Sequence, residues 1–254
     1  MEKLGVIAYN FSFKDIEDIF KWCKENFVEF IEISAKDLEQ AKKIMNKYNV
    51  KISQVSAGND FVQKTKEELL NQVEKVGQLC KKVKELECNI IRIDGGWPKE
   101  GVNIKDYKDL IIEGIERSIE IAEKENVYLA LDNHGVITND YEFQIEIFKK
   151  INSKFLGANL DTMNYRWYGY PVEKLVEIYK LIAPYTLHTH IKDGVGSREN
   201  YIGKVLGQGE IPVVDAIKIL IENKYKGVWC VEYEGNDKEV GYKKCVEFLR
   251  NLKL

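Results

Sequence analysis

The amino-acid sequence has 254 residues, of which 44% are hydrophobic and 31% are charged. This composition is typical of one folded domain, here residues 1–254, and argues against disorder. The 38 basic and 41 acidic residues give a formal net charge of -3, so the chain as a whole has no electrostatic attraction to nucleic acid or to an anionic membrane. We therefore expect neither class of partner.

The five cysteines form no Cys-x-x-Cys pair, and the first residues lack the cationic and apolar segments of a secretory signal. No apolar run approaches about 18 residues, the length that predicts a membrane span. We expect a cytoplasmic protein whose thiols are reduced and buried.

Short apolar runs rich in Val and Ile recur along the chain, and each is followed by a longer segment with helical spacing. In one such segment Ile111, Ile115, Ile119 and Ala122 recur every three or four residues, as on the buried face of a helix. The eight runs are Leu4–Tyr9, Val28–Ile33, Val50–Val55, Ile90–Ile93, Val127–Asp132, Phe155–Asp161, Tyr185–Ile191 and Val228–Glu232.

This alternation indicates parallel βαβ units, and eight units predict a single α/β domain that closes as a (β/α)8 TIM barrel. An open doubly wound sheet is the alternative. Its usual fingerprint, Gly-x-Gly-x-x-Gly directly after the first strand, does not occur here, which favours the barrel.

The fifth to eighth predicted strands each have an ionisable residue at or next to the carboxyl end: Asp132, Asp161, His190 and Glu232. The carboxyl ends of barrel strands meet at the mouth that carries barrel active sites. Converging carboxylates repel one another, and a divalent cation removes that cost. The sequence therefore predicts one metal ion, Mn, Mg, Co or Zn, held by these four side chains; a structural polar network is the alternative.

The three histidines lie in or next to these strand ends. His188 and His190 share one face of a strand, and the outer residue is better placed at the mouth. We assign His190 as the ligand and His188 as a wall or supporting residue, and the reverse assignment stays open. His134 either reaches substrate from a loop over the mouth or supports the turn at Gly135.

Five segments resemble, in their order and spacing, the xylose isomerase-like sugar-phosphate isomerase/epimerase family. They are Leu129–Gly135, Leu160–Asn164, His188–Asp193, Gly207–Pro212 and Val231–Glu234. The resemblance covers essentially the whole chain and implies a (β/α)8 barrel with a divalent metal on Asp132, Asp161, His190 and Glu232. The family usually has Glu at the position of Asp132, so this side chain is one methylene shorter.

The same resemblance implies a substrate pocket lined by Arg92 and Glu32, unless these two form a buried ion pair instead. Lys192 is either a charged donor to substrate or a solvated loop lysine. Ketose epimerases of the family have His at the position of Asn164 and an Arg soon after the second His, whereas the nearest here is Arg198. We assign both residues to substrate binding, but the resemblance does not identify the substrate.

Aromatic residues are frequent in the expected strand-end loops. Trp97 is expected either to cover the C–H face of a sugar or to pack beneath its loop. The glycine-rich segment 194–198 borders the pocket, as a lid or as a phosphate contact.

The expected function is isomerisation or epimerisation of a small sugar or sugar phosphate through a metal-stabilised enediolate. Glu232 and Asp132 are the expected acid and base. If one removes a proton and the other returns it on the opposite face of the same carbon, the product is an epimer; if only one face is reached and the proton returns to the adjacent carbon, the product is an isomer. The alternatives are a metal-dependent dehydratase of a cyclic polyol ketone and a catalytically inactive sugar-binding barrel. A three-metal endonuclease for abasic DNA needs more histidines than the three present. Relatives in the family lead us to expect a homo-oligomer.

Overall fold

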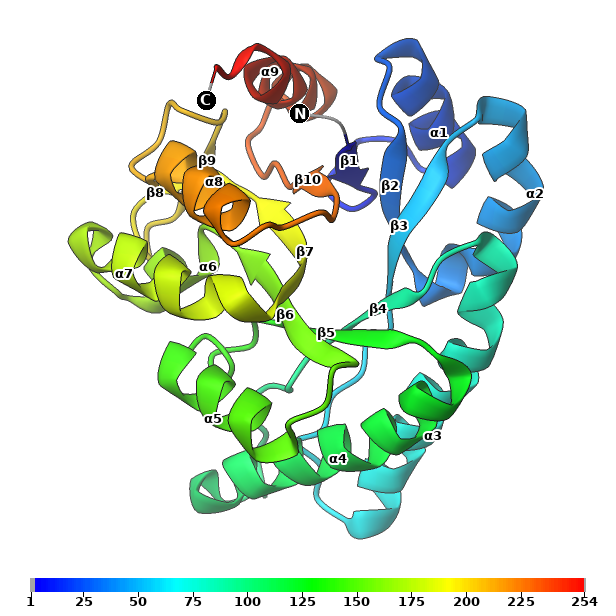
Figure 1. Ribbon diagram of the computed structural model, residues 1–254, viewed down its shortest axis with the longest axis vertical. Coiled ribbons are helices and arrows are strands. Elements are labelled where there is room, and N and C mark those ends of the chain that lie inside the picture. Colours follow the sequence, from blue (N-terminus) through cyan, green and yellow to red (C-terminus); the bar gives the residue numbers. More distant parts are fainter. Residues whose placement is uncertain (1–2, 254) are drawn as a thin grey trace.

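The computed structural model describes residues 3–253 and contains a closed barrel of eight strands in the order β1-β10-β7-β6-β5-β4-β3-β2. All neighbouring strands in the barrel are parallel. The helices surround the barrel on the outside (Figure 1). The predicted (β/α)8 barrel is confirmed.

The barrel strands overlap all eight predicted runs. They are β1 (Leu4–Ile7), β2 (Phe30–Ser34), β3 (Lys51–Ser56), β4 (Ile90–Ile93), β5 (Tyr128–Asp132), β6 (Leu156–Asp161), β7 (Thr186–Ile191) and β10 (Trp229–Val231). The helices are α1 (Ile16–Glu25), α2 (Leu38–Tyr48), α3 (Lys66–Lys82), α4 (Tyr107–Glu125), α5 (Tyr141–Ile151), α6 (Asn164–Tyr168), α7 (Val172–Ile182), α8 (Val213–Glu222) and α9 (Lys238–Asn251).

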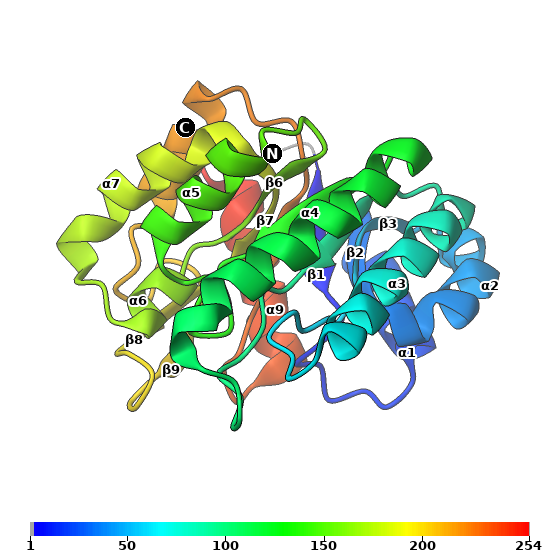
Figure 2. The ribbon, with the colours of Figure 1, turned by 90° about the horizontal axis from the view of Figure 1, so that it is seen from below.

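A short antiparallel hairpin, β8 (Asp193–Val195) with β9 (Ile202–Lys204), follows β7 directly and was not predicted. It projects from the same side of the barrel as the loops that follow β1 and β4 (Figure 2). This is the side to which the carboxyl ends of the strands point, so the hairpin borders the barrel mouth.

Helix ends follow local capping rules. Thr65 accepts a hydrogen bond from the backbone N–H of Glu68 at the start of α3, and the Glu68 side chain reaches back to Thr65 as a capping box. Asp140 caps α5, because its side chain accepts hydrogen bonds from the backbone N–H groups of Glu142 and Phe143. Asn126 ends α4 in the left-handed conformation, which asparagine tolerates better than most residues.

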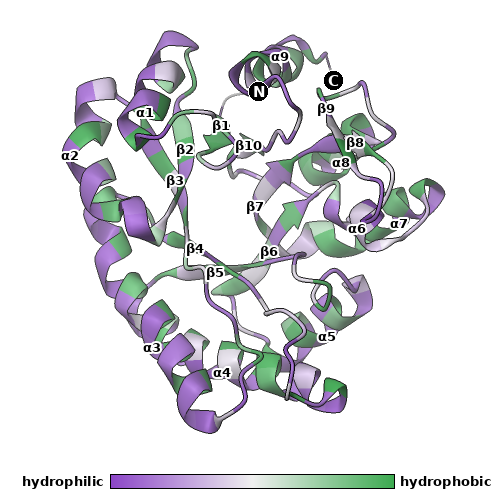
Figure 3. Ribbon diagram, turned by 180° about the vertical axis from the view of Figure 1, so that it is seen from behind, coloured by the Kyte–Doolittle hydropathy of each residue, from purple (hydrophilic) through white to green (hydrophobic). Residues whose placement is uncertain are grey.

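The helices bury their apolar stripes against the strands and direct polar side chains outward, as the hydrophilic outer faces of α2 and α3 show (Figure 3). On α4 the buried residues include Ile111, Ile115 and Ile119, as the spacing predicted. Across residues 3–253, none of the helices combines the length and the apolar character needed to cross a bilayer.

One helix contact depends on the missing side chain of a glycine. A Cβ on Gly114 of α4 would lie 2.3 Å from Cδ1 of the fully buried Phe61. We expect Gly114→Ala to lower the free energy of unfolding by about 1–2 kcal/mol, because overpacking outweighs a helix-propensity gain of about 1 kcal/mol. Urea unfolding measures this change in the free energy of unfolding. Glu120→Ala, on the exposed face of α4, is the control, and an equal stability of the two variants would refute the contact.

Candidate active site

The carboxyl ends of the strands bring a layer of ionisable side chains together inside the barrel mouth. Its members are Glu32, Arg92, Asp94, Asp132, Asp161, His188, His190, Lys192 and Glu232. All of them are buried except Glu232, which is partly buried. Burial without compensation destabilises charged groups, so the contacts within this layer decide what it can do.

Asp161, His190 and Glu232 form the first group, in which one ligand atom from each side chain lies within 4.8 Å of the others. Oδ1 of Asp161 accepts hydrogen bonds from the backbone N–H groups of Met163 and Asn164, at 2.7 and 2.9 Å. Its Oδ2 has no hydrogen-bond partner within residues 3–253. Burial raises the pKa of Asp161 to about 7, although Lys192 favours the charged form.

These donors fit a divalent cation. The group offers two carboxylates and one imidazole, and Oδ2 of Asp161 accepts no hydrogen bond from the residues described. This is the mixed oxygen and nitrogen set that Mn, Mg, Co and Zn accept. Three protein ligands leave coordination positions for water or substrate. The group therefore has the composition expected of a catalytic metal site.

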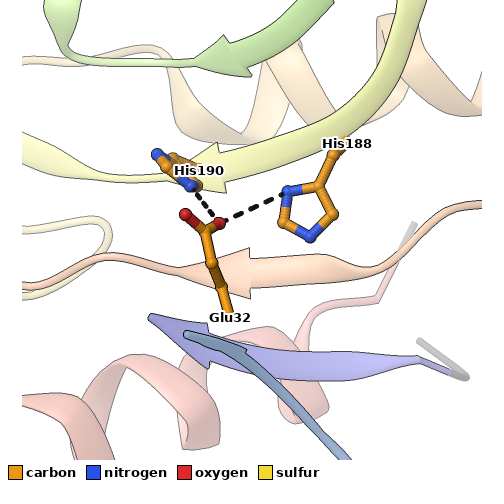
Figure 4. A group of neighbouring side chains, drawn as sticks. All are labelled: Glu32, His188 and His190. Carbon is orange, nitrogen blue, oxygen red and sulfur yellow. Dashed lines mark hydrogen bonds and ion pairs between the residues drawn. The ribbon is translucent and has the colours of Figure 1, made fainter. Parts of the chain in front are cut away.

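His190 lies between two carboxylates. Its Nε2 is 2.6 Å from Oε2 of Glu32, and its Nδ1 is 3.0 Å from Oε2 of Glu232; Figure 4 shows the Glu32 side. Burial opposes charge on the ring, but the two carboxylates raise the pKa of His190 well above its ordinary value. Metal-binding histidines commonly hold a carboxylate with the ring nitrogen remote from the metal, so Glu32 orients Nδ1 toward the Asp161 and Glu232 side.

His188 lies next to the same Glu32, with its Nδ1 3.8 Å from Oε2 (Figure 4). The stronger contact of Nδ1 is with Oδ1 of Asn159, at 2.9 Å, and Nδ2 of Asn159 donates to Oδ1 of Asp132 at 3.0 Å. Burial lowers the pKa of His188 to about 3, so the ring is neutral. Because the Asn159 amide oxygen accepts, the Nδ1 of His188 carries the proton, and His188 supports Asp132 through Asn159.

Asp132 belongs to a second group, together with Asp94 and His134, again with ligand atoms within 4.8 Å. Oδ2 of Asp132 is 3.6 Å from Nη1 of Arg92, and Nδ1 of His134 is 3.7 Å from Oδ1 of Asp94. Burial opposes the effect, but Asp94 raises the pKa of His134. The structure thus brings three of the four predicted ligands together and places Asp132 with different neighbours.

Arg92 links Glu32 to the Asp94 and Asp132 side of the site. Its Nη1 is 3.4 Å from Oε1 of Glu32 as well as near Asp132, and its Nη2 is 3.9 Å from Oδ1 of Asp94. The buried Arg92–Glu32 ion pair named as an alternative is present, and Arg92 also lines the cavity described below.

Lys192 is buried, so it is not a solvated loop lysine. Its Nζ is 2.8 Å from Oε2 of Glu234, 3.0 Å from Oε1 of Glu232 and 3.8 Å from Oδ2 of Asp161. Burial opposes the charge, yet these carboxylates raise the pKa of Lys192 well above its usual range. A permanent cation therefore lies beside the Asp161, His190 and Glu232 group.

A cavity of about 170 Å³ opens above the two groups. It is lined by Tyr9, Asn10, Arg92, Asp132, His134, Asn164, Lys192, Glu232 and Glu234. Trp97 and Arg198 lie outside this lining. Trp97 packs edge to face on His134 with ring centroids 5.0 Å apart, and the guanidinium of Arg198 lies 6.0 Å from the centre of the Trp167 ring.

Sequence reasoning missed Asp94, Asn159 and Glu234 as site residues. Asp94 directly follows β4, so the rule that found Asp161 and Glu232 would also have found it. Glu234 is two residues after Glu232, as His190 is after His188. Asn159 is a neutral residue inside a strand and carries no signal of its own.

Comparisons with known proteins agree with this fold. The family described as "Xylose isomerase-like TIM barrel" matches residues 16–252. A search of the curated proteins found no match.

Three solved structures illustrate the likeness. A D-tagatose 3-epimerase-like protein is 22% identical over 98% of this chain and 97% of its own, with a TM-score of 0.80. The probable 3-DHS dehydratase AsbF of Bacillus anthracis is 17% identical over 99% and 100%, with a TM-score of 0.79. The IOLI protein with a binding zinc atom is 17% identical over 97% and 96%, with a TM-score of 0.79. At these identities the likeness shows the fold.

Proposed function

Because the chain belongs to the xylose isomerase-like TIM barrel family, we propose that it is a metal-dependent enzyme that isomerises or epimerises a small sugar. The observation that carries the proposal is the buried group of Asp161, His190 and Glu232 beside a polar cavity. One barrel fold supports different reactions, so the residues of the site decide which reaction takes place.

Asp161, His190 and Glu232 would hold the metal, and Asp132 completes the proposed set if its carboxylate turns from Arg92 toward the cation. A bound divalent ion supplies a Lewis acid that stabilises negative charge on adjacent substrate oxygens when a neighbouring carbon is deprotonated. Glu32 holds His190 in the orientation that this role needs.

Asp132 and Glu232 are the proposed acid and base. They line the cavity from β5 and from the end of β10, so they approach a bound sugar from different strands. Although burial opposes ionisation, Lys192 and His190 hold the pKa of Glu232 well below its usual value, which keeps this carboxylate in the ionised form that a base and a metal ligand both need. Proton removal by one carboxylate and return by the other on the opposite face inverts the carbon; return to the adjacent carbon gives isomerisation.

The remaining polar lining is assigned to substrate. Arg92, His134, Asn164 and Lys192 all line the cavity, where they donate hydrogen bonds to hydroxyl and carbonyl oxygens. Asn164 is buried and its backbone N–H is already used by Asp161, so its side chain is the part available to a ligand. Arg198 and Trp97 lie outside the lining, and we propose that their loops bring them over a bound sugar.

Deuterium exchange tests the proposed chemistry without assuming the product. We expect protein loaded with Mn, Mg, Co or Zn to incorporate solvent deuterium next to the carbonyl of one or more ketoses in D2O, measured by proton NMR. Chelation should abolish exchange, and Glu232→Gln should slow it by about 100-fold or more. Sugar binding without exchange under every metal would instead identify a catalytically inactive sugar-binding barrel.

A dehydratase acting on a cyclic polyol ketone is the second candidate, and one contact favours it. His134 lines the cavity with its Nδ1 3.7 Å from Oδ1 of Asp94, and an additional proton donor is what departure of a hydroxyl group as water requires. Product analysis separates the two, because dehydration creates a conjugated carbonyl with ultraviolet absorbance and epimerisation does not.

A further inference from the structure

The loops that follow the seventh and eighth strands of (β/α)8 barrels commonly bind phosphate, through backbone N–H groups of glycine-rich turns. Here these loops follow β7 and β10. From the backbone N–H groups of the loop after β7 and the charges of the loop after β10, we infer that the substrate is an unphosphorylated sugar and not a sugar phosphate. The inference rests on the proposed function and narrows its substrate class.

The Asp193 carboxylate occupies the N–H groups of the glycine-rich turn 207–211. Oδ2 accepts from the backbone N–H groups of Gly207 and Gly209, at 2.8 and 3.0 Å, and Oδ1 accepts from that of Ile211 at 3.2 Å. The two remaining N–H groups, at positions 208 and 210, donate to backbone oxygens. A carboxylate of the protein thus already uses the N–H groups of this turn that a ligand phosphate would need.

Asp193 itself is held firmly in this position. Oδ1 also accepts from the N–H of Gly194 at 2.8 Å, and the side chain is buried. Burial raises the pKa of Asp193, and the four N–H groups oppose that shift. A Cβ on Gly209 would lie 2.1 Å from Oδ1 of Asp193, so the turn and the carboxylate fit closely and leave no space for a phosphate between them.

The N–H groups at positions 196–198, in the second glycine-rich segment 194–198, also donate hydrogen bonds within the protein. The N–H of Gly196 donates to Oε1 of Glu210 at 3.0 Å, and that of Ser197 donates to Oδ1 of Asn200 at 2.8 Å. The N–H of Arg198 donates to a backbone oxygen of α6. Of the two arginines in this region, Arg166 is paired with Glu210 at 2.6 Å, and the guanidinium of Arg198 lies over the Trp167 ring.

Charge around the cavity also disfavours a phosphate. The loop after β10 carries Glu232, Glu234 and Asp237, and the cations that line the cavity already contact carboxylates at 2.8–3.6 Å. A phosphate ester brings two further negative charges and has few protons to donate. The hydroxyl groups of a neutral sugar donate to carboxylates, so this lining suits an unphosphorylated polyol.

The test compares a ketose with its terminal phosphate ester on the metal-loaded wild-type protein. We expect kcat/KM for the free ketose to exceed that for the ester at least tenfold, by the deuterium-exchange assay. A higher kcat/KM for the ester would overturn the inference. If neither sugar is turned over, the proposed function is wrong, and the inference about phosphate is then tested by calorimetric titration of both sugars. Tighter binding of the free ketose supports the inference, and tighter binding of the ester overturns it.

Lys204 provides a control, because it lines a neighbouring groove that also contains Glu234. We expect Lys204→Met to leave kcat/KM unchanged for both sugars. A selective loss toward the ester would reveal a phosphate contact that the inference excludes. Inorganic phosphate is the matching simple probe: at constant ionic strength it should leave Tm unchanged, and a rise in Tm that Lys204→Met removes would also overturn the inference.

Discussion

Asp161→Asn is expected to weaken divalent-metal binding by more than about 100-fold while the protein still folds. The substitution removes the anionic Oδ2, which has no hydrogen-bond partner within residues 3–253. An asparagine oxygen can still accept from the backbone N–H groups of Met163 and Asn164. Loss of an outer-shell partner costs about 10–100-fold in metal affinity, and loss of a direct ligand costs more.

Competition with a chromophoric chelator, or calorimetric titration with Mn or Zn, measures this affinity. The matched control is Asp60→Asn, another carboxylate in a strand-end loop that pairs with Lys99 at 3.0 Å and lies outside the cavity. The control should bind metal as the wild type does. Wild-type affinity in Asp161→Asn would remove the Asp161, His190 and Glu232 group from consideration as the metal site.

Glu32→Gln is expected to lower both the stability and the metal affinity of the protein. Glu32 is completely buried and contacts Arg92 at 3.4 Å and His190 at 2.6 Å. Removing one partner of a buried ion pair costs about 3–5 kcal/mol, because the other charges lose their compensation. The same change releases the ring of His190, so metal affinity should fall by about 10–100-fold.

Urea unfolding of the metal-free protein and metal titration give the two quantities separately. Glu29→Gln, three residues earlier and exposed, is the control and should stay within about 0.5 kcal/mol of the wild type. The combination distinguishes the two variants: Asp161→Asn loses metal and keeps stability, whereas Glu32→Gln loses part of both. Equal stability of Glu32→Gln and its control would mean that Glu32 does not hold Arg92 and His190.

Much of the fold could be predicted because the signals are local. The run Val127–Asp132 coincides with β5 except for its first residue, and the stripe on α4 is buried as its spacing predicts. The positions of Asp161, His190 and Glu232 followed from one rule, that polar residues in parallel barrels are tolerated at the carboxyl ends of strands. Their convergence is a consequence of closing the barrel.

Two parts of the site could not be predicted from sequence spacing. Glu32 and His190 are 158 residues apart, and only the closed barrel shows that their side chains meet. Lys192 has the same sequence context whether it points to solvent or into the barrel mouth, and only the tertiary structure shows that it meets Glu232 and Glu234.

The sequence by itself determined the barrel, its strands and which mouth is polar, because hydrophobic periodicity and strand-end polarity are properties of neighbouring residues. The tertiary structure decided how the charges at that mouth divide between the Asp161 group and the Asp132 group. That division depends on side-chain length and on inter-strand register: Asp132 contacts Asn159 and Arg92 at 3.0 and 3.6 Å, and its short side chain places the carboxylate with these neighbours. Distances of this kind arise only when strands remote in sequence lie side by side.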